Sequence, residues 1–407
     1  MWRTRMVSRL HEYLIMTIAQ FDGDFWSDEL ILDPYPHYQA MREGGSIVWL
    51  SQHGAYALPR YGSVQHALTS PEVFSSASGC MMNEPMNEAT GSKIMLCTDG
   101  EEHRSLRRLF AKPLTPKALT MLTPRLEALV SERIDTLLDG GVFDAVEDLA
   151  HLLPLSIVAE LIGLDAEGRE RMLDWANGIF ETYGPIENPR TVAGLEIAEQ
   201  VIGYVLERLD RAELAPDGWG EGLFKAADAG EITEERARMM LIDYIAPSLD
   251  TTINAISSAI ELFADNPVQW DLLRSDPGLI PGAIDEVLRI ETPIRAFARS
   301  VVRDHEIDGA VLPAGSRAVI IYASANRDAL KYPDPDRFDI RRDASDHLAF
   351  GAGSHVCAGM FLAKLEMQVM FKAMAAKVKS MKVTERKRVP HNTLRGLSML
   401  ETTFAPA

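Results

Sequence analysis

One cysteine of this chain sits in a setting that suits chemistry better than core packing. The stretch Phe350-Gly-Ala-Gly-Ser-His-Val-Cys-Ala-Gly359 has three glycines and delivers Cys357 to an apolar segment, Met360 to about Val378, that we expect to be helical. Glycine permits backbone shapes and close approaches that a Cβ would forbid. The positive N-terminal end of the following helix would favour thiolate over thiol. We therefore expect Cys357 to be the axial ligand of a large, flat cofactor.

A second candidate is a pair of donors in the helix expected at Glu101–Arg108. His103 and Arg107 are four residues apart and therefore share one helix face. The pair could bind an anionic group, or it could lie on a solvated helix face. The spacing alone allows both interpretations.

The longest periodic segment, Thr233–Asn266, predicts one helix about 50 Å long with a kink in its middle. Pro247 has no N–H and clashes with the carbonyl of Asp243, so the helix should kink there. Asp250 and Thr251 follow the kink and place an acid beside a hydroxyl, which suits proton transfer. The alternative is that Thr251 bonds back to a carbonyl and Asp250 forms a salt bridge.

The remaining pattern predicts a mainly α fold with small β-sheets. Helical periodicity covers 115–138, 149–161, 169–183, 192–209 and 281–290, a hairpin is expected at 46–60, and strands are expected near 299–302, 305–308 and 318–322. The segment 76–97 is polar, methionine-rich and without clear period, which is typical of a functional or mobile loop. We expect one domain over residues 16–407, preceded by an N-terminal extension at 1–15.

Composition excludes several classes of protein. The 407 residues are 46% hydrophobic and 25% charged, which is ordinary for a globular protein. The net charge of -18 argues against a nucleic-acid surface and against binding to anionic membranes, and no apolar run reaches the ~18 residues of a membrane span. The three cysteines form no CxxC pair, which argues against a zinc ribbon. So few cysteines are more typical of a protein in the reducing cytoplasm than of a disulfide-stabilised protein.

Together these residues resemble the cytochrome P450 family of haem-thiolate monooxygenases over nearly the whole chain. The cysteine loop matches the pattern F-G-x-G-x-H-x-C-x-G at every fixed position, Glu286-x-x-Arg289 matches E-x-x-R, and His103-x-x-x-Arg107 matches the propionate-binding helix. The chain is most similar to the soluble bacterial branch. The resemblance implies a single-domain P450 fold, with a long central helix over the haem and the cysteine loop beneath it.

The resemblance also implies roles for individual residues. Cys357 becomes the axial ligand of haem b iron, with Phe350 and Gly351 in the same loop beside the ring. The implied propionate donors are His103, Arg107, Arg299 and His355. Glu286 and Arg289 become a buried structural pair, completed by Arg342. Asp250 and Thr251 match the acid–alcohol pair that delivers protons during activation of O2.

One departure from the family pattern lies next to that pair. The family usually has Ala/Gly-Gly where this chain has Pro247-Ser248. Proline can replace the disruption that glycine causes, so an oxygen-binding groove is still expected. Ser248 adds a hydroxyl that could order a water or narrow the groove.

The resemblance places substrate contacts in four parts of the chain. The residues at these positions are Met81, Met82, Ile94, Phe180, Tyr183, Asp243, Ala246, Ser248, Ile294, Phe297 and Ala298. This set predicts an apolar, partly aromatic cavity softened by methionine, suited to a small aromatic or terpenoid molecule.

Asp243 is the exception in that set. Facing the cavity, it would favour a substrate hydroxyl, phenol or amine and repel a carboxylate. The alternative is a salt bridge, with Arg295 as the candidate partner. The chain is also similar to bacterial monooxygenases that oxidise para-substituted aryl acids, and Asp243 argues against a carboxylate clamp at its position.

Two functions follow from the resemblance. The first is a monooxygenase that takes electrons from NAD(P)H through a ferredoxin and its reductase, and hydroxylates or O-demethylates a small apolar molecule. The second is a peroxide-driven oxygenase or a haem-based binding or sensing protein. The pair Asp250–Thr251 favours the first, because a peroxide-driven enzyme needs no proton relay to activate O2.

Overall fold

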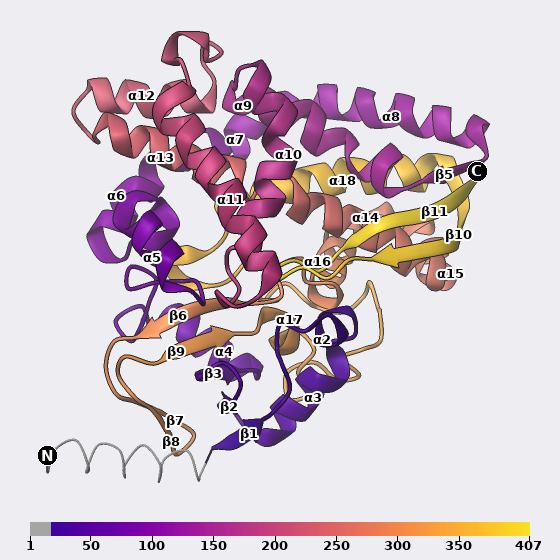
Figure 1. Cartoon of the computed structure of the whole chain (residues 1–407). Helices are drawn as coiled ribbons and strands as arrows, with labels where there is room; N and C mark the ends of the chain where they lie inside the picture. The colour runs from indigo at the N-terminus through magenta and orange to yellow at the C-terminus, as the bar shows by residue number, and fades with distance from the viewer. Residues whose placement is uncertain (1–17) are drawn as a thin grey trace, which may run out of the picture.

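The computed structural model describes residues 18–407, and helices make up most of it (Figure 1). The N-terminal extension expected at 1–15 lies outside the described residues. The helices are α2 (Asp28–Leu32), α3 (Tyr35–Gly44), α4 (Tyr61–Thr69), α5 (Glu84–Thr90), α6 (Gly100–Phe110), α7 (Pro116–Leu119), α8 (Thr123–Gly140), α9 (Ala159–Ile162), α10 (Ala166–Glu181), α11 (Pro189–Gly203), α12 (Trp219–Asp228), α13 (Glu234–Ile245), α14 (Asp250–Asp265), α15 (Pro267–Ser275), α16 (Ile280–Ile290), α17 (Tyr322–Ala325) and α18 (Met360–Lys377).

Small sheets flank the helices in the described part of the chain. The larger one has the order β1 (Ala19–Phe21), β2 (Val48–Leu50), β3 (Ala55–Leu58), β9 (Arg317–Ile320), β6 (Phe297–Val301) and β4 (Phe74–Ser75). The others pair β10 (Val378–Arg388), β11 (Leu397–Pro406) and β5 (Val142–Asp144), and β7 (His305–Ile307) with β8 (Ala310–Leu312). The expected hairpin is the antiparallel pair β2–β3, in which Val48 faces Ala57.

The segment expected to be one kinked helix is divided into two helices. The hydroxyl of Thr233 accepts a hydrogen bond from the N–H of Arg236 at the start of α13, and α14 ends at Asn266, as the capping signals predict. Between the helices, residues 246–249 form turns. Pro247 removes one backbone donor, so the helical hydrogen-bond ladder stops there. The break is therefore larger than the predicted kink.

The irregular segment 76–97 contains a helix that the sequence analysis did not predict. The side chain of Asn83 caps α5 by accepting from the N–H of Met86, and Pro85 occupies the first turn. Both are ordinary helix-start signals. The helix has only seven residues, too few to show a period.

A buried ion pair ties α16 to the loops that precede the cysteine. Arg289 donates from Nε to Glu286 Oε2 over 2.7 Å and from Nη1 to the carbonyls of Asn326 and Pro335, each over 2.8 Å. Arg342 adds a contact of 3.1 Å from its Nε to Glu286 Oε1. The side chain of Asn326 then accepts from the N–H of Leu348, two residues before Phe350. The pair thus fixes the approach to the cysteine loop.

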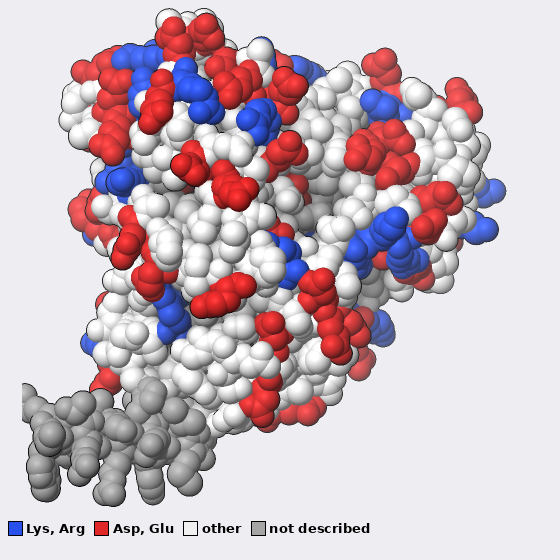
Figure 2. Space-filling model, in the orientation of Figure 1, with Lys and Arg blue, Asp and Glu red and all other residues white. Residues whose placement is uncertain are grey.

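Surface charge is mixed but mostly negative on the face shown in Figure 2. Acidic side chains are frequent over the helical part of that face, whereas basic side chains gather over β10 and β11. Within residues 18–407, no helix combines the length and apolar character that a membrane span needs.

Candidate active site

The cysteine loop folds as it does because glycines take positions that other residues would strain. Gly351 and Gly353 have φ values of 70° and 69°. A Cβ on Gly353 would lie 2.5 Å from the carbonyl oxygen of Leu68, so the loop packs directly on the end of α4. The N–H of Cys357 donates to the carbonyl of Phe350 over 2.8 Å and closes the loop before α18 begins.

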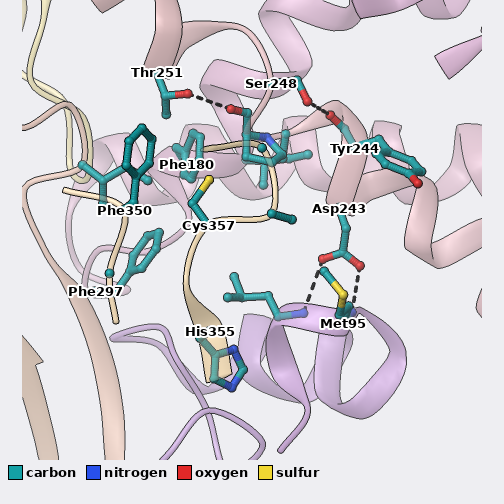
Figure 3. A pocket seen from close by; sticks show the side chains of 18 of the residues that line it. Met95, Phe180, Asp243, Tyr244, Ser248, Thr251, Phe297, Phe350, His355 and Cys357 are labelled. Carbon is teal, nitrogen blue, oxygen red and sulfur yellow. Dashed lines mark hydrogen bonds between the residues drawn. The ribbon is translucent and has the colours of Figure 1, made fainter. Parts of the chain in front are cut away.

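Cys357 borders a large cavity, and its side chain is exposed to the space of that cavity (Figure 3). Burial raises the pKa of its thiol, while the N–H of Gly359, the charge of Arg107 and the N–H of Met360 act in the opposite direction. The sequence analysis expected the helix start to favour the thiolate. Burial is the largest of these effects, so the direction of the shift is opposite to the expected one.

Most of the residues expected to contact substrate line this cavity together. They are Met81, Ile94, Phe180, Tyr183, Asp243, Ala246, Ser248, Ile294 and Phe297. Phe180, Tyr183 and Phe297 form an aromatic cluster whose ring centroids lie 5.0–6.4 Å apart. The cavity wall is thus mostly apolar and partly aromatic.

Met82 and Ala298 do not line the main cavity, and their predicted contact with substrate is wrong. Both border a smaller cavity beside Trp26. The reason for Ala298 is strand alternation: its neighbours Phe297 and Arg299 point into the main cavity, so Ala298 points to the other side of the sheet. Met82 packs with the residues behind that sheet.

The four expected propionate donors border the same cavity. The rings of His103 and His355 lie 4.0 Å apart, and His355 Nε2 is 3.2 Å from Asp99 Oδ1. Burial lowers the pKa of His355, although its contact with Asp99 opposes the shift. Arg107 donates to the carbonyl of Val356, and Arg299 donates to the carbonyl of Ala298.

These residues fit a haem group. Within residues 18–407, neither Arg107 nor Arg299 forms an ion pair with a carboxylate, so two cations border an apolar cavity without an anionic partner. Two propionates would neutralise them. Phe350 and Gly351 border the cavity beside Cys357, where a porphyrin ring would need residues packed closely against its face. A thiolate, cations and apolar walls are the donor set that an iron porphyrin requires.

The helix break brings hydroxyl groups to the side of the cavity opposite Cys357 (Figure 3). Thr251 Oγ1 donates to the carbonyl of Pro247 over 2.8 Å, and Ser248 Oγ donates to the carbonyl of Tyr244. Both hydroxyls therefore bind carbonyls at the helix break, and both keep lone pairs that can accept a hydrogen bond.

The alternative to a functional role is half met: Thr251 bonds back to the carbonyl of Pro247, as that alternative predicts, whereas Asp250 forms no salt bridge among the described residues. Its Oδ2 atom is buried and has no hydrogen-bond partner among the described residues. Burial and the nearby charge of Asp174 raise its pKa to about 7. Thr251 lines the cavity, whereas Asp250 lies behind it on α14.

Asp243 does face the cavity, and the alternative salt bridge to Arg295 is absent. Asp243 Oδ2 accepts from the N–H of Met95 over 2.7 Å, and Oδ1 accepts from the N–H of Leu96 over 3.4 Å. Arg295 is buried elsewhere and donates to the carbonyls of Phe25 and Asn392. Burial raises the pKa of Asp243 to about 7, and the two N–H donors and Arg236 only partly offset it.

The sequence analysis missed other polar groups of the cavity wall. Glu366 on α18 borders the cavity, and neither carboxyl oxygen has a hydrogen-bond partner in the described chain. Burial raises its pKa to about 8. Its signal was present in the sequence, because Glu366 is four residues from both Leu362 and Met370 and so shares their buried face. The hydroxyl-bearing residues Thr90, Tyr244, Thr252 and Tyr322 also line the cavity and were not predicted.

Comparison with known proteins identifies the family. Residues 278–404 match the model of the family described as Cytochrome P450. The chain is 36% identical over 379 residues to Cytochrome p450 CYP199A2 of Rhodopseudomonas palustris, which covers 92% of each chain. The protein belongs to the cytochrome P450 family. Its site is therefore that of a haem-thiolate monooxygenase, an oxidoreductase that uses O2.

Other P450 proteins support the same assignment. The chain is 32% identical over 363 residues to Cytochrome P450 monooxygenase PikC of Streptomyces venezuelae, covering 84% of this chain and 83% of the relative. The solved structure of Cytochrome P450 CYP109Q5 from Chondromyces apiculatus superposes with a TM-score of 0.80 at 27% identity, covering 96% of this chain and 99% of the other. The predicted mainly α P450 fold is confirmed.

Proposed function

We propose that this P450 takes electrons from NAD(P)H through an iron–sulfur ferredoxin and its reductase, and hydroxylates or O-demethylates a small, largely apolar, aromatic molecule. The mostly apolar cavity with its aromatic cluster carries the proposal for the substrate. The three free cysteines suit a reducing compartment, and we place the reaction in the cytoplasm.

The residues around the cavity have different roles in this reaction. Bound haem supplies the oxidising chemistry, with O2 as the oxidant. Cys357 would hold the cofactor, and Arg107 and Arg299 would bind its propionates. Thr251 presents a hydroxyl to the cavity at the helix break. Asp250, with a pKa of about 7, can take up and release a proton near neutral pH and resupply that hydroxyl.

Asp243 gives the cavity a preference among aromatic molecules. Its carboxyl group borders the cavity, and within residues 18–407 it forms no ion pair. Each oxygen accepts one backbone N–H and keeps a lone pair for another donor. We therefore expect a substrate with a hydroxyl, phenol or amine group, and poor binding of carboxylates.

A comparison of electron sources tests the proposal. With a bacterial ferredoxin, its reductase and NAD(P)H, the haem-loaded protein should oxidise a small aryl ether or phenol, whereas added hydrogen peroxide should support much slower turnover. Faster turnover with peroxide, or none with the electron-transfer chain, would favour the peroxide-driven alternative. Substrates can be found first by screening small aromatics for the absorbance change caused by displacement of water from the haem iron.

A further inference from the structure

Two buried cysteines outside the haem site lie in direct contact. Cys80 Sγ and Cys97 Sγ are 3.5 Å apart, and Thr90 Oγ1 lies 3.7 Å from Cys97 Sγ. Neither cysteine borders the main cavity, but their neighbours Met81 and Leu96 do. The contact joins the two ends of a segment that forms one wall of the cavity.

The two cysteines are held by different parts of the fold. The carbonyl of Cys80 accepts from the N–H of Ala298, so this residue is attached to β6 of the larger sheet. Cys97 closes a helical turn, Met95–Cys97, whose backbone binds the carboxyl group of Asp243 on α13. Between them lie α5 and the cavity-lining residues Met81, Met86, Thr90, Ile94, Met95 and Leu96.

We propose that Cys80 and Cys97 form an oxidisable dithiol, which a hydroperoxide converts into an intramolecular disulfide. The disulfide would join the two ends of this wall of the cavity and restrain its motion. The alternative is that both thiols only fill space in the core, as buried cysteines often do. The contact between the sulfurs favours the proposal, because the two atoms at 3.5 Å must approach each other by only about 1.5 Å to form a disulfide.

The electrostatic surroundings favour one sulfur as the nucleophile. The contact with Cys97 lowers the pKa of the Cys80 thiol against the effect of burial, and the charges of Arg299 and Arg317 act in the same direction. The same contact, together with burial, raises the pKa of Cys97. Because Arg299 and Arg317 lie near Cys80 whereas Asp243 acts on Cys97, we expect Cys80 to ionise first and to attack the peroxide.

The reaction balances with one hydroperoxide. The Cys80 thiolate attacks one oxygen of hydrogen peroxide, the O–O bond breaks, and a sulfenic acid and hydroxide form; the hydroxide takes up the proton that Cys80 released. The sulfur of Cys97 then attacks the sulfur of Cys80, the S–O bond breaks, and water leaves with the Cys97 proton. Two thiols and one peroxide thus give one disulfide and two waters, with two electrons passing from sulfur to peroxide.

The test uses the haem-loaded protein and added hydrogen peroxide, without substrate or electron donor, so it is independent of the proposed function. After treatment with a few equivalents of peroxide, denaturation and alkylation, the number of reactive thiols should fall from three to one, with a loss of ~2 Da in intact mass. Digestion without reductant should yield one linked peptide pair, and dithiothreitol should restore both thiols. Cys80→Ser and Cys97→Ser should each abolish the link.

A second measurement tests whether the disulfide restrains this wall of the cavity. A phenyl-substituted imidazole that binds haem iron should leave the oxidised protein several-fold more slowly than the reduced protein, with no such difference in Cys80→Ser. If the haem absorbance bleaches while all three thiols stay alkylatable, or if Cys80 is oxidised to sulfinic acid without a link, the dithiol assignment is wrong. Equal release rates from the linked and reduced protein would show that the disulfide does not restrain the cavity wall.

Discussion

Asp243 is the residue at which this cavity departs most from a purely apolar one. It lies on α13 and faces the cavity (Figure 3). Its carboxyl group is held by two backbone N–H groups rather than by a side-chain cation. Because burial raises its pKa to about 7, its charge changes within the range in which enzymes work. Substrate preference should therefore depend on pH.

The pH dependence can be measured with two small probes. Below pH 6 Asp243 is mostly neutral and above pH 8 mostly anionic, given its pKa of about 7. A benzylammonium ion, whose amine stays protonated over this range, should therefore bind about tenfold more tightly at pH 8 than at pH 6, and a simple benzoate more weakly. In spectral titrations, Asp243→Asn should remove the part of both trends with a midpoint near pH 7; Glu366 also borders the cavity, and its pKa of about 8 places its contribution at higher pH. Asp250→Asn is the matched control, because Asp250 has a similar pKa but does not border the cavity, and it should keep them. Tight benzoate binding that Asp243→Asn leaves unchanged would contradict the repulsion argument.

Thr251 is the hydroxyl whose removal should separate electron consumption from product formation. In the proposed function Thr251 helps to supply protons at the cavity, so without it we expect reducing equivalents to be released as hydrogen peroxide. Thr251→Ala should lower product formed per NAD(P)H by about tenfold or more, and peroxide should rise to match. Thr251→Ser keeps the hydroxyl and should retain most of the coupling. Unchanged coupling in Thr251→Ala would refute the role.

At the scale of elements, local signals predicted the helix break well, and contacts between distant segments escaped prediction. Pro247 predicts the interruption between α13 and α14, because the missing N–H is a property of the residue itself. The orientation of Ala298 depends instead on how β6 pairs with β9, which brings together residues about twenty positions apart. The partners of Asp243 lie almost 150 positions away in the sequence, so no local pattern could show them. The cysteine loop, by contrast, was recognisable because all its requirements lie within ten residues.

The ion pair Glu286–Arg289 connects α16 to the loops before Cys357, so its loss should lower haem binding. Both side chains are fully buried, so Glu286→Gln would leave the charges of Arg289 and Arg342 without compensation. A loss of about 3–5 kcal/mol is expected. Because Arg289 also holds Asn326 and the loops before Cys357, haem content per chain should fall, which the ratio of haem to protein absorbance measures.

A matched control separates this effect from the loss of any ion pair. Arg125 and Glu160 form a bidentate pair with both contacts at 2.7 Å, but the side chains are 47% and 55% exposed. Glu160→Gln should cost less than about 1 kcal/mol and leave haem content unchanged. A Glu286→Gln variant with full haem content would show that the pair does not support the site.

At the scale of the whole molecule, buried acids are distributed over several elements. Burial raises the pKa of Glu181 on α10, Asp243 on α13 and Asp250 on α14 to about 7, and that of Glu366 on α18 to about 8. The folded protein therefore holds protons that the unfolded chain releases near pH 4. His391 acts in the opposite sense, because burial lowers its pKa to about 3. Burial also lowers the pKa of His53, His305 and His355. These histidines oppose the acids as His391 does, and the four acids with strongly raised pKa values should dominate.

Stability should consequently fall as the pH rises from 5 to 8. In this range the unfolded carboxyl groups are already ionised, and ionising the folded ones costs free energy because they are buried. Each acid with a pKa of about 7 contributes a loss of about 2 kcal/mol across the range. The thermal midpoint of the haem-loaded protein, followed by circular dichroism, should decline accordingly. Asp250→Asn should make the decline shallower by raising the midpoint at pH 8, whereas Asp271→Asn, at an exposed position on α15, should leave it unchanged. A midpoint that is constant or rises over this range, or an Asp250→Asn variant with the slope of the parent, would show that these acids are ionised in the folded protein through contacts with the bound cofactor or solvent.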